Sequence, residues 1–267
     1  MRKLLPLLFA TVLFANSLSQ IRDIKRNAKA LKGLKISLIE FKENNFLWKM
    51  LLVLNPKKPK GAFWFLPHDN ENSAFDSAIY AVKKYGGGFL AVVNGDRRYN
   101  RGQDPNRNFS YSKTRECKLQ LAPSFIYTQK VMEIINRYKA PNMPYLALHN
   151  NTNRGGISIL KNSRYTKSFL AYPKEVVLQG KGLADEDSLI YIAGTSPTPP
   201  KEKVAKLLNA GLNVKYEIVT PQNNDCSMSH FIVLNYGENY YNIEAQHGKT
   251  AVQKEMIDRV MRIININ

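Results

Sequence analysis

One short segment contains two residue types that could bind a divalent metal ion together. His68 and Glu71 lie three residues apart in Phe65-Leu-Pro-His68-Asp-Asn-Glu71, directly after the apolar run 61–66. A neutral imidazole and a carboxylate on a turn between a strand and a helix can reach one zinc ion. The simpler interpretation is a polar pair at a surface helix cap. Residues elsewhere in the chain must therefore decide between the two.

Three further patterns could supply the rest of a hydrolytic site. In chain order they are Gln103-Asp104-Pro-Asn106-Arg107-Asn108, Ala147-Leu-His149-Asn-Asn-Thr152 and Asn242-Ile-Glu244-Ala-Gln-His247-Gly248. A guanidinium binds a carboxylate through two parallel hydrogen bonds. A glutamate near a metal can serve as general base and acid.

In this order, the four patterns resemble those of the zinc carboxypeptidase superfamily, which comprises the funnelin metallopeptidases and the aspartoacylase and succinylglutamate desuccinylase branch. The family's order is His-x-x-Glu, Asp-x-Asn-Arg, a histidine at a strand end and a late glutamate. The resemblance covers roughly residues 45–260 and implies that His68, Glu71 and His149 hold zinc. Three protein ligands leave a fourth position for water, as in catalytic zinc sites. The residues around His149 look more like the aspartoacylase branch, and those around Glu244 more like the peptidase branch.

The same resemblance implies roles for the other polar residues. Glu244 would be the general base and acid, and Arg107 with Asn106 would hold the carboxylate of the substrate. Arg98, or alternatively Arg97, would stabilise the oxyanion.

Asp104 would orient its loop by accepting hydrogen bonds. His247 is expected to support or pack beside Glu244, with a second His/Glu pair as the alternative, and His230 is expected to be structural or at the surface.

One departure concerns the substrate. The peptidases carry a mobile tyrosine about twenty residues before the late glutamate, whereas this chain has no tyrosine at 221–228. Asp225 and Ser227 lie there instead and could meet a polar or amino-bearing substrate.

Apolar runs and helical spacing predict alternating strands and helices. The chain is therefore predicted to be α/β, a single domain with a mixed, mostly parallel, twisted sheet flanked by helices. The strands are expected at 49–54, 61–66, 89–93, 145–148, 188–193, 214–219, 230–234 and 240–245. The helices are expected at 20–35, 74–85, 123–138, 201–211 and 251–264.

The N-terminus has the pattern of a secretory signal peptide. A basic start, an apolar run at 4–15 and small residues at Ser17 and Ser19 predict a signal at 1–19. The catalytic domain would then be 20–267, in the periplasm or secreted, with no stable membrane span after the signal is removed. The alternative is an uncleaved membrane anchor.

Composition limits the partners. The chain of 267 residues has a formal net charge of +18, which favours an anionic partner such as a bacterial wall or membrane surface. A basic, solvated surface with no partner is equally compatible. No nucleic-acid motif is present, so no nucleic-acid partner is expected. Cys117 and Cys226 could form one bridge, and neither has metal-ligand spacing.

These observations leave three hypotheses. The first is an exported zinc carboxypeptidase or amidohydrolase that cleaves next to a free carboxylate, with a peptidoglycan stem peptide as the leading substrate. The second is a deacylase that cleaves an N-acyl amino acid with the same zinc site. The third is an inactive, wall-binding relative, which the intact set of His68, Glu71, His149 and Glu244 argues against.

Overall fold

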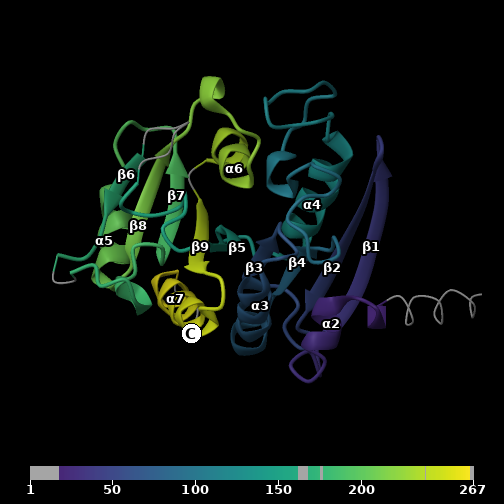
Figure 1. Ribbon diagram of the computed structural model, residues 1–267, viewed down its shortest axis with the longest axis horizontal. Coiled ribbons are helices and arrows are strands. Elements are labelled where there is room, and N and C mark those ends of the chain that lie inside the picture. The colour runs from purple at the N-terminus through teal and green to yellow at the C-terminus, as the bar shows by residue number, and fades with distance from the viewer. Residues whose placement is uncertain (1–17, 162–167, 175–176, 238, 265–267) are drawn as a thin grey trace, which may run out of the picture.

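The computed structural model describes residues 18–161, 168–174, 177–237 and 239–264 (Figure 1). Residues 1–17 of the expected signal peptide lie outside these described residues. None of the helices in the described ranges has the length and apolar character needed to cross a membrane. The helices are α2 (Arg22–Arg26), α3 (Asn72–Tyr85), α4 (Phe125–Tyr138), α5 (Lys201–Asn209), α6 (Met228–Tyr236) and α7 (Thr250–Ile263).

A single twisted sheet organises the described chain. Its strands are β1 (Lys35–Glu43), β2 (Phe46–Leu54), β3 (Phe63–Leu66), β4 (Gly88–Val92), β5 (Tyr145–Asn151), β6 (Ser168–Ala171), β7 (Leu189–Gly194), β8 (Asn213–Ile218) and β9 (Tyr240–Gln246). Their order is β1-β2-β4-β3-β5-β9-β7-β8-β6. The central strands β4, β3, β5 and β9 are parallel to one another. β7 is antiparallel to β9, and β8 is parallel to β7, so the sheet reverses direction there.

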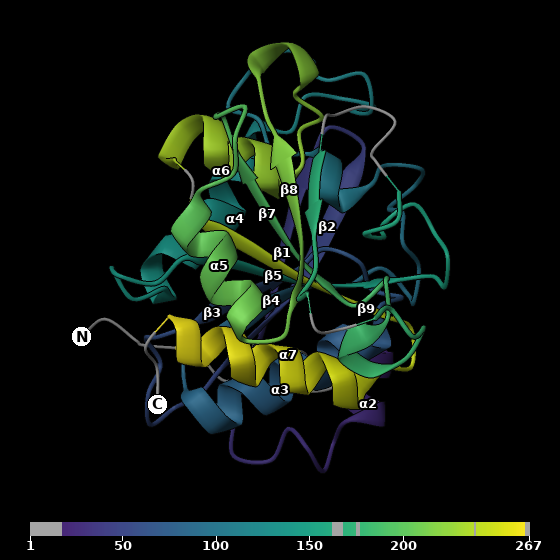
Figure 2. The same cartoon turned by 90° about the vertical axis from the view of Figure 1, so that its left-hand side faces the viewer.

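Helices cover both faces of this sheet, as the two views show (Figures 1 and 2). α3, α5 and α7 pack on one face, where their apolar residues join the inward side chains of the strands in one core. α4 and α6 pack on the other face over a second core that is rich in aromatic residues. The predicted α/β class and mixed sheet are therefore confirmed.

Some predicted elements were wrong or incomplete. The apolar run 230–234 was expected to be a strand but belongs to α6. This helix is apolar on almost every side because it lies between β7, β9 and the aromatic core, so its sequence shows no helical period. The predicted helix at 20–35 is helical only over α2, and β1 and β6, which are partly exposed, were not predicted.

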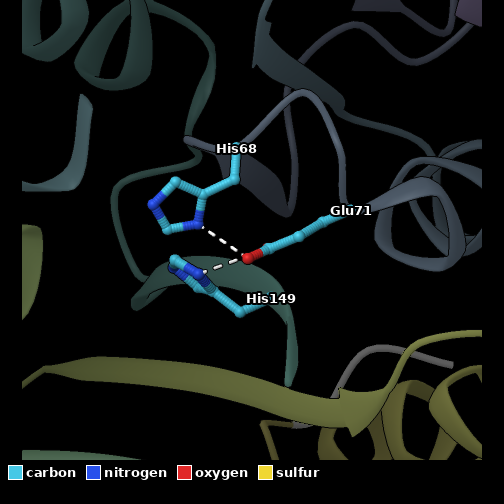
Figure 3. Close-up of side chains that lie close together, drawn as sticks. All are labelled: His68, Glu71 and His149. Atoms are coloured by element: carbon cyan, nitrogen blue, oxygen red, sulfur yellow. Dashed lines mark hydrogen bonds and ion pairs between the residues drawn. The ribbon is translucent and has the colours of Figure 1, made fainter. Parts of the chain in front are cut away.

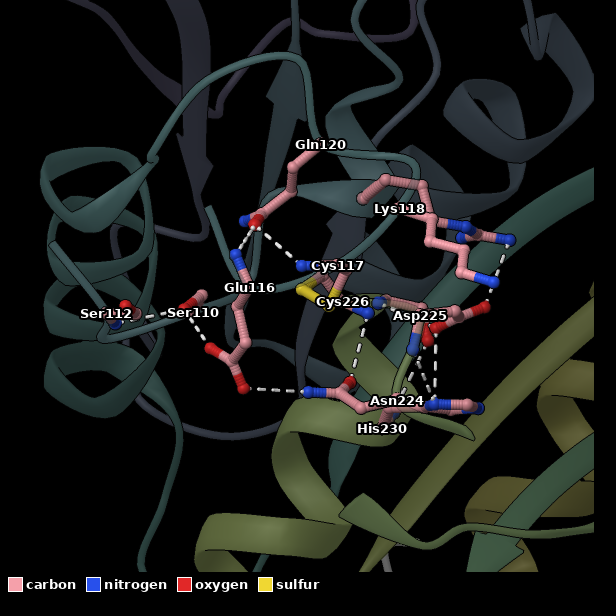
Figure 4. Close-up of a disulfide and its surroundings, with 12 residues drawn as sticks. Ser110, Ser112, Glu116, Cys117, Lys118, Gln120, Asn224, Asp225, Cys226 and His230 are labelled. Carbon is pink, nitrogen blue, oxygen red and sulfur yellow. Dashed lines mark hydrogen bonds and ion pairs between the residues drawn. A yellow bond between two sulfur atoms is a disulfide. The ribbon is translucent and has the colours of Figure 1, made fainter. Parts of the chain in front are cut away.

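A disulfide joins two loops on the α6 side of the sheet (Figure 4). Cys117 and Cys226 are bonded although they are 109 residues apart. Hydrogen bonds support both sides of the bridge: Gln120 accepts from the backbone N–H of Cys117, and Asn224 donates to Glu116. The bridge thus fixes the start of α6 against the loop that precedes α4.

Loss of this bridge is expected to lower the free energy of unfolding by about 2–4 kcal/mol, because the unfolded chain loses the constraint on a long loop. Urea denaturation of oxidised and reduced protein measures the difference. The C117S/C226S double variant is the matched control, since reductant should not change its midpoint. Equal midpoints for oxidised and reduced wild type would contradict the expectation.

Candidate metal centre

The three predicted ligands are brought together by two neighbouring strands. β3 ends at Leu66, and Pro67 follows, so His68 leaves the sheet at the carboxyl end of this strand. Glu71 lies at the residue before α3. His149 lies within β5, which pairs in parallel with β3. The carboxyl ends of parallel strands meet at one edge of a sheet, which is where ligands gather in α/β folds.

The side chains of these three residues converge on one point (Figure 3). One ligand atom from each lies within 4.8 Å of the others. Nδ1 of His68 is 2.7 Å from Oε1 of Glu71, and Nδ1 of His149 is 3.4 Å from Oε2. All three residues are buried. Two imidazoles and one carboxylate form the donor set of a catalytic zinc site.

One oxygen atom of this group, Oε2 of Glu71, lacks a hydrogen-bond donor, which a metal ion could replace. Oε2 of Glu71 is buried and makes no hydrogen bond, since His149 lies near it without hydrogen-bond geometry. A buried carboxylate oxygen without a donor is costly. A cation held between the three side chains would satisfy it.

A carboxylate and an arginine surround the metal ligands. Nε2 of His68 lies 2.8 Å from Oδ1 of Asp104, and such a partner orients a metal-binding imidazole. Burial alone would lower the pKa of His68, but the carboxylates of Glu71 and Asp104 raise it above its ordinary value. Arg98 lies 3.1 Å from Glu71 and 3.4 Å from Asp104. Arg97 is exposed, so Arg98 is the arginine of this site.

Glu244 lies beside the ligand group without belonging to it. It is on β9, in register with His149 on β5, so both side chains project from the same face of the sheet. Asn242 donates a hydrogen bond of 2.8 Å to its Oε1. Burial raises the pKa of the Glu244 carboxyl above its ordinary value, and His149 opposes this rise. A carboxylate with a raised pKa next to a metal site is suited to proton transfer.

Glu71 and His149 line a cavity of about 790 Å³, together with Arg98, Arg107 and Glu244. Arg107 forms an ion pair of 3.3 Å with Asp225 at the cavity wall. Asn106, its predicted partner in substrate binding, instead accepts a hydrogen bond of 3.1 Å from the backbone of Met228 and so positions the start of α6.

A second group of carboxylates, at Asp185–Asp187, supports the loop that follows β5. Asp187 accepts a hydrogen bond of 2.6 Å from the backbone N–H of Arg154, and Asp185 accepts one of 3.1 Å from Gln246. Residues of this loop, among them Thr152 and Arg154, line the cavity. The group therefore holds one wall of the cavity in place.

Comparison with known proteins places this geometry in a known fold. No family model matches the chain, and no curated protein matches its sequence. The chain is similar to the solved structure of a protein named as a metallopeptidase from Shewanella baltica OS155. The TM-score is 0.50 at 10% identity, over 91% of this chain and 89% of that one. The chain therefore has the same α/β fold as that protein.

Two other solved structures are similar at lower scores. A metallo-carboxypeptidase from Burkholderia cenocepacia has a TM-score of 0.49 and 11% identity, over 91% of this chain and 68% of that one. An aspartoacylase family protein from Mesorhizobium loti MAFF303099 has a TM-score of 0.46 and 14% identity, over 88% and 69%. Both scores are below 0.5, so the chemistry must be argued from this chain's own residues.

The structure also places three further polar residues that the sequence analysis considered: Ser227, His230 and His247. Ser227 caps α6 by accepting a hydrogen bond from the backbone N–H of His230. His230 is buried, within 3.3 Å of both Glu217 and Asp225, and is structural as predicted. His247 is exposed at the cavity wall.

Among the cavity residues that sequence reasoning missed are Tyr191, Lys215 and Glu217. The sequence did contain a signal for two of them. In Asn213-Val-Lys215-Tyr-Glu217-Ile, polar and apolar residues alternate, which places both charges on one face of a strand. What the pattern could not show is that this face looks toward the metal centre.

Proposed function

We propose that this chain is a zinc-dependent hydrolase that cleaves an amide bond next to a free carboxylate. The observation that supports this most directly is the convergence of His68, Glu71 and His149 with Glu244 beside them. Zinc is the metal that two imidazoles and one carboxylate suit. When bound, it would act as a Lewis acid toward the scissile carbonyl and acidify a water molecule.

The chain's own residues then have separate tasks. Arg107 binds the substrate carboxylate in place of Asp225, its present partner. Glu244 accepts the proton of the attacking water and passes it to the amine nitrogen as the C–N bond breaks. Arg98, which lines the same cavity, donates hydrogen bonds to the oxygen that becomes negative.

A carboxypeptidase acting on a short peptide is the first choice of activity. Charged side chains line the cavity, including Arg107 from the loop before α4 and Lys215 and Glu217 from β8. Such a lining suits a polar substrate better than a large apolar one. We further propose an exported enzyme that trims peptidoglycan stem peptides. The signal-like residues 1–19 and the net charge of +18 support this choice. The disulfide also favours an oxidising compartment.

An N-acyl amino acid deacylase is the second candidate. His149-Asn-Asn-Thr152, which resembles the aspartoacylase branch, lines the cavity. Both activities would use the same zinc ligands and the same arginine.

Purified protein supplied with zinc tests these proposals on three substrate sets: N-blocked dipeptides, N-acyl amino acids and a muropeptide mixture. We expect hydrolysis in at least one set, loss of hydrolysis with a zinc chelator, and recovery when zinc returns. If fully zinc-loaded protein hydrolyses none of them, the chain is an inactive relative and the proposed function is wrong.

Replacing Arg107 by lysine should lower kcat/KM roughly 10- to 100-fold for substrates with a free carboxylate, because a bidentate charged hydrogen bond is lost. The same substrates with an amidated carboxylate should respond far less. Arg154→Lys is the matched control, since Arg154 lines the same cavity and has no role in the proposed reaction. Equal losses of kcat/KM for the free-carboxylate and the amidated substrates would contradict this role of Arg107.

A further inference from the structure

Lys215 carries a buried charge that the proposed reaction does not use. The residue is 1% exposed, lies on β8 and lines the cavity of the metal centre. Its ammonium donates one hydrogen bond of 3.0 Å to the carbonyl oxygen of Lys161. Within the described residues, no carboxylate oxygen lies within the 4.0 Å of an ion pair. Lys215 is therefore a buried cation whose only hydrogen-bond partner in that part of the chain is neutral.

The surroundings of Lys215 disfavour its charged form. Burial lowers the pKa of Lys215, and the more distant carboxylates of Glu217 and Glu244 only partly oppose this. Taking an ammonium out of water without a contacting anion is unfavourable. An anionic group delivered by a ligand would offset that cost.

Two of the carboxylates nearby already lie close to other basic side chains. Asp225 lies 3.3 Å from Arg107 and 3.3 Å from His230. Glu217 lies 3.2 Å from Nε2 of His230, on the side of the imidazole opposite Asp225. These groups thus balance one another at the cavity wall. Lys215 is a buried cation at this wall for which the described residues offer no ion-pair partner.

The sheet places Lys215 at a useful distance from the reaction. Asn242 on β9 is in register with Tyr191 on β7, which is in register with Lys215 on β8. All three therefore project from the face that carries Glu244. Lys215 is two strands from β9, which corresponds to about 10 Å between backbones. A side chain of the substrate could bridge that gap, whereas the reacting amide could not contact both ends.

We propose that Lys215 binds a second carboxylate of the substrate, located on the side chain of the residue whose α-carboxylate is held by Arg107. The site would then prefer substrates that release an amino acid with an acidic side chain. This inference rests on the proposed function and adds a substrate class to it. In this assignment Lys215 selects the substrate and takes no part in bond cleavage.

The test compares two N-blocked dipeptides that differ only in a C-terminal glutamate or glutamine. These side chains have nearly the same shape, so the ratio of their kcat/KM values reports the charge alone. We expect the wild type to prefer glutamate roughly 10- to 100-fold, the range for a charge-assisted hydrogen bond. In Lys215→Met the ratio should fall to about 1, and in Lys215→Arg a preference for glutamate should remain.

Lys161→Met is the matched control. Lys161 also lines the cavity, but it is exposed, and its ammonium donates to the carbonyl of Arg154. Its variant should keep the preference for glutamate. A ratio of rate constants does not depend on the fraction of active enzyme, so partial misfolding of Lys215→Met would not imitate the result.

The outcomes separate the two proposals. If the wild type cleaves both dipeptides with equal kcat/KM, the role of Lys215 is wrong and the hydrolase proposal stands. If Lys215→Met keeps the wild-type ratio, another residue reads the side chain and the inference is also overturned. If zinc-loaded wild type cleaves no substrate of any set, both proposals fall together.

Discussion

Replacing Glu244 by glutamine is expected to reduce kcat by about 10²- to 10⁴-fold, the usual contribution of general acid–base catalysis. Glutamine has nearly the same shape but cannot accept a proton from water. Because Glu244 lies outside the group of His68, Glu71 and His149, the variant should still bind zinc. Steady-state kinetics and metal analysis of the same sample measure both properties.

Glu43→Gln provides the matched control for loss of a buried carboxylate. Glu43 accepts hydrogen bonds of 2.8 Å from the backbone N–H groups of Ile126 and Tyr127 at the start of α4. It does not line the cavity and has no role in the proposed reaction. This substitution should lower stability and leave kcat close to wild type. If Glu244→Gln instead loses its metal, Glu244 is a ligand and its assignment as a base is wrong.

Replacing His149 by alanine is expected to have the second large effect. It removes one of three ligands, so the affinity for zinc should fall by more than about 100-fold, since loss of an outer partner alone costs 10- to 100-fold. Activity should disappear at zinc concentrations that saturate the wild type. Competition with a chromophoric chelator measures the affinity directly.

The control for this variant is His247→Ala, which removes another imidazole that lines the same cavity but lies outside the ligand group. It should bind zinc with wild-type affinity. Equal zinc affinity for His149→Ala and the wild type would show that the metal, if any, lies elsewhere.

The local parts of the site were predictable from the sequence. His68 and Glu71 are close in the chain, and the apolar run and proline before them fix the turn that carries both. His149 and Glu244 were predictable only through the order of the four motifs. Their direct register across β5 and β9 depends on which strands become neighbours, and no short segment of sequence determines that.

Other features depended on tertiary contacts that local patterns do not contain. The run at 230–234 was mistaken for a strand, because a helix buried on nearly all sides has no polar face to reveal its period. Lys215 and Glu217 were passed over because β8 could not be placed beside β7, nor its polar face directed to the cavity. The pairing of Cys117 with Cys226 stayed open for the same reason.

The disulfide also bears on the side of the cavity that carries Arg107. Cys226 follows Asp225, and Cys117 belongs to the loop that comes after Arg107, so the bridge ties together the two segments that carry the Arg107–Asp225 ion pair. A freshly synthesised chain in reducing surroundings would lack this bridge. If Arg107 binds the substrate carboxylate as proposed, formation of the Cys117–Cys226 bridge would be a maturation step that holds Arg107 and Asp225 in place. Samples stored with thiol reagents would then lose this bridge.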